Sequence, residues 1–524
     1  MVGPMKTRVL PLVCLFSIWG LATASAQTAP PPKKPKLILA IAVDQFRWEY
    51  LKRFKDGYTS GLKKVIEQGA VFEDAHYVHY PTVTAVGHST FMSGALPAVS
   101  GIVGNDWYDR ETGKSTTSVA DATTKLLGAE GAGSSPRKLL VSTVGDEIKM
   151  SGQQSKVIGV SIKDRSAILP VGHMADGAYW FDNKSAQWVT STYYAKSLPE
   201  WVAKANAAQP DAKSKNAVWS TLEGGKPLCT MGTATPALAQ CTSLEASPWG
   251  NEMIEEFAEQ ALVGEKLGTH TGTDILAVSF SSNDYVGHAK GPDSPEVRDI
   301  SIRTDRVLGK LLDAVDKSIG LANVIFVMTA DHGVAPVPEG NNARKMIGGR
   351  MPANAITKAI NDALGAKYGP SRWVESAVGS NVYLNWELIE YKKLDLGEVQ
   401  RIAARAAAKV PHVFRAYSAD QLQNGSVSTE AVDTAVRNGF YMPRSADVIL
   451  VQDPFYLFDA GGTSHSTPFS YDTHVPVIFM GPGIKPGRYF GKITVNDIAP
   501  TLSAIVGVTE PSGAMGRILQ EMWQ

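Results

Sequence analysis

Short apolar runs alternate with amphipathic stretches along most of this chain. Five runs of β-branched, aliphatic and aromatic residues have the length of buried strands, at 37–43, 156–162, 274–280, 323–328 and 475–480. Helical periodicity lies between them, for example at 61–68, 252–266 and 295–318. This alternation predicts an α/β fold in which a largely parallel central sheet is sandwiched by helices.

Two long stretches interrupt the alternation, at about 169–247 and about 334–446. We expect both to be cap insertions at the carboxyl edge of the sheet, where they would wall a substrate site. Cys229 and Cys241 lie in the first of them, separated by a turn-rich segment. Their spacing favours a local disulfide over two free thiols.

The amino terminus has the pattern of a secretory signal peptide. Lys6 and Arg8 precede an apolar stretch at 9–21, and Ala24-Ser25-Ala26 resembles a cleavage site. We therefore assign 1–26 to a signal peptide that is too short to span a membrane, and the Pro- and Lys-rich stretch 27–35 to a linker. The catalytic domain is expected over 36–524, in a periplasmic or secreted protein without a membrane span.

Composition is that of a large globular enzyme. The chain has 524 residues, 44% of them hydrophobic, with 51 basic and 51 acidic residues. A balanced charge of this kind argues against a nucleic-acid surface. The sequence leaves the oligomeric state open.

Carboxylates and imidazoles follow the predicted strands, and zinc takes both kinds of ligand. In an open α/β sheet, ligands bind beyond the carboxyl ends of the strands. Three Asp and three His at such positions suffice for two Zn²⁺ ions with open coordination sites. The predicted ligands are Asp44, Asp284, His288, Asp331, His332 and His465. His474, which lies just before the last strand, is an alternative to His465.

Thr84 is the predicted nucleophile. A helical pattern at 85–92 follows it, so its hydroxyl would lie where a helix amino terminus favours an anion. A bound zinc ion would lower the pKa of this hydroxyl. Thr82 is the competing position.

Together these motifs resemble the alkaline phosphatase superfamily, most closely its phosphate monoesterases of the PafA type, which have a single Thr nucleophile and are related to nucleotide pyrophosphatase/phosphodiesterases. The matching pieces occur in the order found in the superfamily. They are Asp44, Pro81-Thr-x-Thr-x-x-Gly-His88, Gly101-Ile-Val-Gly-Asn105, Lys163-Asp-Arg165, Asp284-x-x-x-His288, Asp331-His-Gly333 and His465.

The resemblance implies a role for each matching residue. Asp284, His288 and His465 would hold the zinc that faces the leaving group. Asp44, Asp331 and His332 would hold a second zinc, which also binds the Thr84 oxygen. Thr84 would then form a covalent phospho-threonine that water hydrolyses. Asn105, Lys163 and Arg165 would bind the phosphoryl oxygens.

Lys163 and Arg165 decide the expected substrate. A monoester dianion presents three non-bridging oxygens. The planar guanidinium of an Arg and the ammonium of a Lys can together neutralise their charge. The related diesterases lack this pair. We therefore expect small-molecule phosphate monoesters as substrates, with a phosphodiesterase or nucleotide pyrophosphatase as the alternative. Thr84 lacks the Cys/Ser-x-Pro-x-Arg context of a sulfatase, and the intact nucleophile argues against a zinc-binding scaffold protein.

Overall fold

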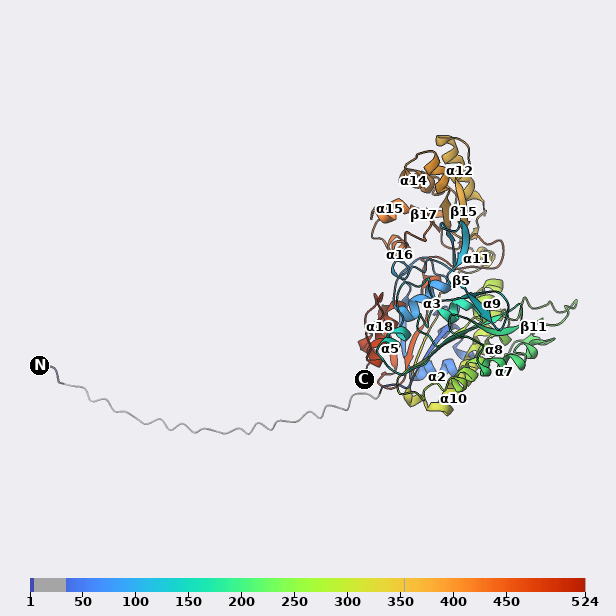
Figure 1. The fold of residues 1–524 in the computed structure, drawn as a ribbon, viewed down its shortest axis with the longest axis vertical. Coiled ribbons are helices and arrows are strands. Elements are labelled where there is room, and N and C mark those ends of the chain that lie inside the picture. The colour runs from blue at the N-terminus through green and yellow to red at the C-terminus, as the bar shows by residue number, and fades with distance from the viewer. Residues whose placement is uncertain (4–33, 353, 524) are drawn as a thin grey trace. The chain divides into compact units, whose positions relative to one another are not determined.

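An 11-stranded mixed sheet forms the centre of the fold (Figure 1), with strand order β21-β2-β20-β13-β1-β12-β7-β8-β9-β5-β6. The computed structural model describes residues 1–3, 34–352 and 354–523. Nearly all of the predicted signal peptide and most of the predicted linker therefore lie outside the described residues. Within the described part, no helix combines the length and the apolar character needed to cross a membrane.

The sheet strands vary in length from three to eight residues. Their bounds are β1 (Leu37–Val43), β2 (Ala70–His76), β5 (Ala120–Leu127), β6 (Ala132–Ser134), β7 (Val157–Ser161), β8 (Gly177–Asp182), β9 (Gln187–Ser191), β12 (Asp274–Phe280), β13 (Val324–Thr329), β20 (Val477–Met480) and β21 (Gly487–Thr494).

The middle of the sheet is parallel, as predicted. β13, β1, β12, β7 and β8 run in one direction, whereas β20 and β9 run against their neighbours. β1 is buried over its whole length, which explains why it reads as a continuous apolar run. Val43 is paired with Phe280, and Ala42 with Thr329. The residues that follow these three strands therefore share one edge of the sheet.

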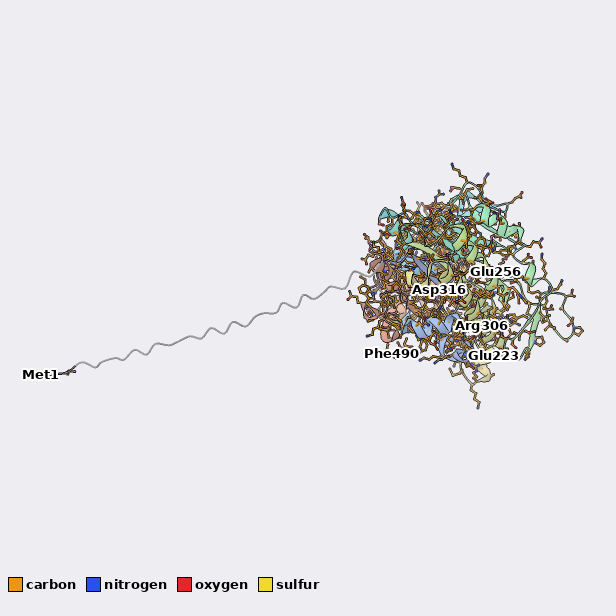
Figure 2. All side chains as sticks on the ribbon, turned by 90° about the horizontal axis from the view of Figure 1, so that it is seen from below. Met1, Glu223, Glu256, Arg306, Asp316 and Phe490 are labelled. Atoms are coloured by element: carbon orange, nitrogen blue, oxygen red, sulfur yellow. A yellow bond between two sulfur atoms is a disulfide. The ribbon has the colours of Figure 1, made fainter. Side chains whose placement is uncertain are left out.

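Helices form two layers around the sheet. α8 and α10 pack together with α2 in one layer, and α3 packs with α5, α6 and α18 in the other. The outward face of the first layer carries charged side chains such as Glu256, Arg306 and Asp316 (Figure 2). The bounds are α2 (Gly61–Gln68), α3 (Thr84–Ser93), α5 (Val144–Met150), α6 (Asp164–Ile168), α7 (Glu200–Ala207), α8 (Pro248–Gly264), α9 (Ser282–Lys290), α10 (Pro295–Ile319) and α18 (Ile498–Val506). Shorter helices are α1 (Tyr50–Arg53), α4 (Pro97–Ser100), α11 (Pro338–Ala343) and α17 (Ser470–Thr473).

The second predicted insertion forms a cap with its own sheet and its own hydrophobic core (Figure 1). Its strand order is β15-β16-β18-β17, and α12 packs against α14, which covers β17 and β18. β18 lies beyond the expected end at residue 446, so the cap extends further along the chain than predicted. The cap elements are α12 (Ala355–Tyr368), β15 (Val374–Val378), β16 (Asn381–Leu384), α13 (Trp386–Tyr391), α14 (Leu396–Ala407), β17 (Val413–Ser418), α15 (Ala419–Gln423), α16 (Ala431–Gly439) and β18 (Val448–Gln452). Two-stranded ribbons are β3 (Asp106–Asp109) with β4 (Lys114–Thr117), and β14 (Gly349–Arg350) with β19 (Tyr456–Leu457).

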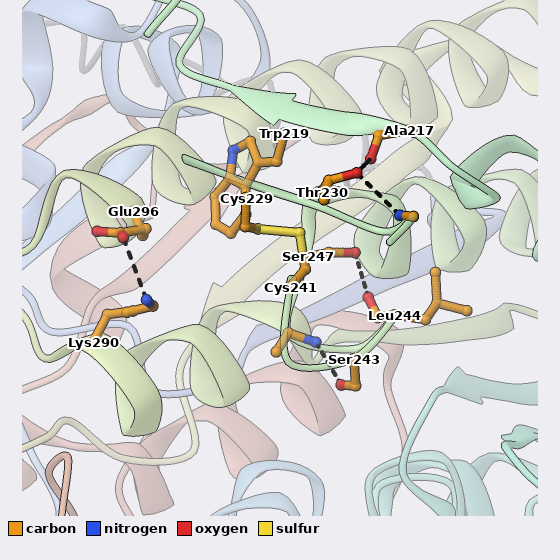
Figure 3. The surroundings of a disulfide bond; sticks show 12 residues. Ala217, Trp219, Cys229, Thr230, Cys241, Ser243, Leu244, Ser247, Lys290 and Glu296 are labelled. Carbon is orange, nitrogen blue, oxygen red and sulfur yellow. Dashed lines mark hydrogen bonds and ion pairs between the residues drawn. A yellow bond between two sulfur atoms is a disulfide. The ribbon is translucent and has the colours of Figure 1, made fainter. Parts of the chain in front are cut away.

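The first predicted insertion has two different parts. β8 and β9 extend the central sheet, because their aromatic residues are buried and β8 pairs with β7. The rest includes the small hairpin of β10 (Val218–Ser220) and β11 (Pro227–Thr230). The Cys229–Cys241 disulfide closes this hairpin against the following loop (Figure 3), which confirms the predicted pairing.

Candidate metal centre and active site

Two clusters of His and Asp side chains meet at the carboxyl edge of the parallel strands. Asp284, His332 and His465 form one, and their ligand atoms all lie within 4.8 Å of one another. The second, by the same measure, consists of Asp44, His88 and Asp331. All six side chains are buried. The sheet register therefore collects groups from distant parts of the chain at one place.

Three of the histidines are held by backbone carbonyl groups. The Nδ1 atoms of His288, His332 and His465 lie 2.8, 2.9 and 2.8 Å from the carbonyl oxygens of Thr463, Gly333 and Thr82. Because a carbonyl only accepts, each Nδ1 carries the proton, and a neutral ring then presents Nε2 as a metal ligand.

The free nitrogens of His288 and His465 face each other, with 3.2 Å between their Nε2 atoms. Two lone pairs at this distance repel unless a proton or a metal cation lies between them. Burial lowers the pKa of His332 to about 4 and holds that of His465 well below its usual value, so both rings are neutral. His288 differs, because the Asp284 carboxylate outweighs burial and raises its pKa to about 9.

His332 lies between the two clusters. Its Nε2 is 3.3 Å from Asp331 Oδ2, and its ring stacks on His465 at a centroid distance of 3.5 Å. Sequence reasoning grouped His332 with Asp44 and Asp331, and His288 with Asp284 and His465. All of these residues do converge, but His332 also contributes to the cluster that contains Asp284.

The Lys163 ammonium bridges the two clusters. Its Nζ lies 2.9 Å from Asp44 Oδ2 and 2.6 Å from Asp284 Oδ2. Burial opposes its charge, but these two carboxylates raise the pKa of Lys163 above its usual value. Burial likewise opposes ionisation of Asp284, yet Lys163 and His288 hold the pKa of that carboxyl well below its usual range.

The clusters carry more carboxylate than the side-chain cations can neutralise. Burial and the nearby Asp44 raise the pKa of Asp331 to about 8. Its Oδ2 atom is buried and has no hydrogen-bond partner among the residues that the structure describes. A buried, unpartnered carboxylate oxygen is costly unless a cation compensates it. With the free imidazole nitrogens, the donor set therefore fits a pair of divalent metal ions.

Thr84 and Thr82 differ in how their hydroxyls are used. Thr84 begins α3, and its Oγ1 lies 3.5 Å from His332 Nε2. The Thr82 hydroxyl instead donates to the carbonyl of Thr467 and accepts from the backbone N–H of the same residue. The hydroxyl beside the metal-ligand cluster is thus that of Thr84, whereas Thr82 fixes the loop that carries His465.

Asn105 bonds the start of α3, and Arg165 lies on α6. The backbone N–H of Ala85 donates to Asn105 Oδ1 at 2.8 Å, which leaves the amide NH₂ of Asn105 as a donor. Arg165 lies in the first turn of α6, and its buried Nε has no hydrogen-bond partner in the described ranges 1–3, 34–352 and 354–523. Lys163 is the N-cap residue of the same helix. Asn105 therefore bonds the first turn of α3, which begins at Thr84, while Lys163 and Arg165 lie at the amino-terminal end of α6.

Gln45 and His88 also belong to the site, although no role was predicted for either. Gln45 donates from its backbone N to Asp331 Oδ1 and from Nε2 to Asp284 Oδ1, so it ties the two clusters together. His88 bonds the Thr84 carbonyl through Nδ1 and Ser279 Oγ through Nε2. His88 occurs in the Gly-His motif, which was a signal for it in the sequence. The sequence signal for Gln45 was no more than its position directly after Asp44.

Gly87 allows α3 to approach the end of β13. A Cβ atom at this position would lie 2.2 Å from the carbonyl oxygen of Asp331. Only glycine fits there without movement of the backbone that carries a predicted ligand.

His474 lies in a different cluster from the predicted ligands. Its Nε2 donates to the carbonyl of Glu73, and its ring stacks between Trp48 and His76. Asp74, His76 and His474 have ligand atoms within 4.8 Å of one another, but the two rings are stacked with planes 16° apart. Lone pairs of parallel rings do not converge on one point. His465, not His474, is the residue that reaches Asp284.

Comparison with known proteins gives consistent matches over almost the whole chain. The family model of type I phosphodiesterase / nucleotide pyrophosphatase matches residues 38–474. Two relatives are each 35% identical and cover 98% of both chains: a protein named calcium-transporting ATPase from Myroides odoratus and alkaline phosphatase PafA from Elizabethkingia meningoseptica. The crystal structure of wild-type PafA is similar, with a TM-score of 0.87 and 35% identity over 94% of this chain and 99% of that chain. A PafA structure with one Thr, one Asn, one Lys and one Arg replaced matches with the same TM-score.

Proposed function

Since the chain belongs to the type I phosphodiesterase / nucleotide pyrophosphatase family of the alkaline phosphatase superfamily and is a homologue of PafA-type alkaline phosphatase, we propose that it is an exported, zinc-dependent phosphatase of phosphate monoesters. We further propose that the reaction passes through a covalent phospho-threonine on Thr84.

The observation that carries the proposal is the position of Lys163. This buried ammonium lies beside the carboxylates of both clusters, and the Thr84 hydroxyl lies beside His332 of one of them. A transferred phosphoryl group with three charged oxygens needs such compensation, whereas a diester carries one charge fewer. In the PafA mutant structure, the replaced Thr, Asn, Lys and Arg are of the same types, in the same order, as Thr84, Asn105, Lys163 and Arg165. This match supports a shared site.

We assign the metal ligands as the family resemblance implies, although the groups within 4.8 Å of one another combine His332 with Asp284 and His465, and His88 with Asp44 and Asp331. Asp284, His288 and His465 would hold one ion, and Asp44, Asp331 and His332 the other. Bound there, two zinc ions would lower the pKa of the nucleophile and neutralise charge on the attacking and departing oxygens. Imidazole and carboxylate donors suit zinc, and the backbone bonds of the histidines keep their Nε2 atoms available.

The chain's own residues would act as follows. The Thr84 hydroxyl gives up its proton and Oγ1 attacks phosphorus, while the bond from phosphorus to the alcohol oxygen breaks. The phosphoryl group is transferred to Thr84, and the departing alkoxide takes up a proton from solvent. The amino terminus of α3, the Asn105 amide, Lys163 and Arg165 stabilise the phosphoryl oxygens. Water then attacks phosphorus and releases inorganic phosphate, which restores the Thr84 hydroxyl.

A comparison of two chromogenic substrates tests this function. The zinc-loaded protein is assayed with nitrophenyl phosphate and with bis-nitrophenyl phosphate. We expect kcat/KM for the monoester to exceed that for the diester by about 100-fold or more, given charge-assisted contacts to the extra oxygen. The family description leaves phosphodiesterase activity as the second candidate. A preference for the diester would make that activity the main one. Acid quenching followed by mass spectrometry should locate phosphate on Thr84.

Export is supported by the disulfide, because such bonds persist in oxidising compartments. We expect the mature protein to begin at Gln27, after the predicted cleavage site. Cell fractionation and amino-terminal sequencing of the native protein would check this. A cytoplasmic protein that still begins at Met1 would contradict it.

A further inference from the structure

A cavity of about 320 Å³ opens between the active-site loops and the cap. On one side it is lined by Val83, which directly precedes Thr84, and by Asn105 and His465. On the other side are the turn between β15 and β16, the end of β18, and the segment that follows β19. The volume lies at the lower end of the range for small-molecule sites.

We infer that this cavity is the leaving-group subsite and that it selects alcohols which are neutral or cationic and carry a hydrogen-bond donor. The inference rests on the proposed function, which places the phosphoryl group at Thr84. The substituent on the departing oxygen must then extend away from Thr84, and the cavity begins at residues that flank this nucleophile.

Gln452 provides the first argument. It is the last residue of β18, its side chain is only 4% exposed, and it lines the cavity. Its Oε1 atom is buried and has no hydrogen-bond partner within the described part of the chain. A buried acceptor without a partner is unfavourable, and solvent does not reach this oxygen in the side-chain position of the structure. Rotation of the Gln452 amide toward the cavity would let a hydroxyl or ammonium group of a bound alcohol satisfy it.

The charge of the cavity provides the second argument. Asp106 and Asp459 both line it, both are exposed, and neither has an ion-pair partner among the described residues. The described lining includes neither Lys nor Arg. This contrasts with the phosphoryl end of the site, where Lys163 and Arg165 lie. The cavity therefore attracts a cationic alcohol and repels a carboxylate or a second phosphate.

Three esters of similar length test the inference: propyl phosphate, aminoethyl phosphate and carboxymethyl phosphate. For each protein, kcat/KM for each ester is divided by kcat/KM for propyl phosphate. These ratios are then compared between variant and wild type, so that the intrinsic reactivity of each ester cancels. Inhibition by inorganic phosphate, which has no leaving group, is measured in parallel.

Two variants have different expected results. Replacing both carboxylates (Asp106→Asn with Asp459→Asn) should lower relative turnover of aminoethyl phosphate and raise that of carboxymethyl phosphate, each about tenfold. Gln452→Met should lower turnover of aminoethyl phosphate relative to propyl phosphate by about tenfold. Inhibition by phosphate should stay the same in both. Asp313→Asn is the matched control, because Asp313 is exposed on α10 and does not line the cavity.

Three outcomes would overturn the inference. Unchanged ester ratios in both variants would show that the leaving group does not contact the cavity. If a variant weakens inhibition by inorganic phosphate by the same factor as it lowers turnover of the esters, these residues would contact the phosphoryl group instead. If the zinc-loaded wild type turns over none of the three esters or nitrophenyl phosphate, the proposed function itself fails, and the inference fails with it.

Discussion

The metal centre and the leaving-group cavity adjoin each other but are built differently. Asp44, Asp331 and His332 are inaccessible to solvent, and each belongs to a strand end whose position is set by the register of β1, β12 and β13. The cavity instead has exposed carboxylates, Asp106 and Asp459, and a wall that comes from the cap. One region is held by the central sheet, and the other by loops and a separate small core.

This difference separates chemistry from selectivity. Groups that must hold metal ions and a nucleophile within tenths of an ångström are carried by the most rigid part of the fold. Groups that recognise the alcohol lie on segments that can change without moving the sheet. We therefore expect substitutions at the sheet edge to abolish turnover of every ester, and substitutions at the cap to alter preference between esters.

Loss of the nucleophile should have the largest effect. Thr84→Ala is expected to lower kcat/KM for nitrophenyl phosphate by about 10⁴-fold or more, because the covalent route is removed. The variant should still bind two equivalents of zinc by elemental analysis, since the remaining ligands are untouched.

Thr82→Val is the matched control for this prediction. Within the described part of the chain, its hydroxyl bonds only the Thr467 backbone, so its loss should cost less than about tenfold in activity. Equal losses in the two variants would remove the distinction between the two threonines.

Removal of the bridging ammonium should have the next largest effect. Lys163→Met is expected to lower monoester turnover by about 100-fold and diester turnover by less than about tenfold, because the third phosphoryl oxygen loses its cation. Steady-state assays of the zinc-loaded variant with both nitrophenyl esters would measure the two losses. Equal losses would mean that Lys163 only maintains the carboxylates Asp44 and Asp284, and that it does not discriminate between substrates.

The parts of this site that were predictable from sequence are those carried by buried strands. β1, β12 and β13 are buried along their whole length and consist mostly of apolar residues, so their ends, and therefore Asp44, Asp284 and Asp331, could be located from the pattern alone. His465 was harder, because it lies in a loop whose path depends on contacts with Thr82 and His288. The preference for His465 over His474 came from the family resemblance.

Other features depend on tertiary contacts that no local pattern encodes. β8 is a short aromatic strand, and its sequence is equally compatible with a small packed subdomain; only its pairing with β7 makes it part of the central sheet. Gln45 connects both clusters through its amide and its backbone, yet Gln has no characteristic spacing from metal ligands. Gln452 could not be identified either, because its importance lies in an oxygen that has no partner among the described residues of the folded chain.

A smaller effect is expected where the cap is attached to the active-site loop. The buried Tyr80 hydroxyl bonds Ser380, which lines the cavity, and donates to the carbonyl of Leu450 at 2.6 Å. Tyr80→Phe should raise KM for nitrophenyl phosphate about threefold and change kcat by less than about twofold, because the cap wall loosens while Thr84 stays in place. A loss confined to kcat would contradict this separation of the cap from the chemistry.

The smallest expected effect concerns the stability of the catalytic domain, independent of the cap. Burial, together with the neighbouring Glu259 carboxyl, raises the pKa of Glu255 on α8 to about 9. The folded state therefore binds this proton more tightly than the unfolded state, so stability should fall as pH rises from about 4.5 to about 9.

Glu255→Gln keeps the shape of the side chain and removes the titration. Between pH 6 and pH 9, the fall in Tm should be smaller in the variant by about 2 °C. Scanning calorimetry of the zinc-loaded protein would measure this difference in Tm. If the cap unfolds in a separate transition, only the transition of the catalytic domain should shift. An equal fall in the variant and the wild type would show that Glu255 is ionised in the folded protein at neutral pH.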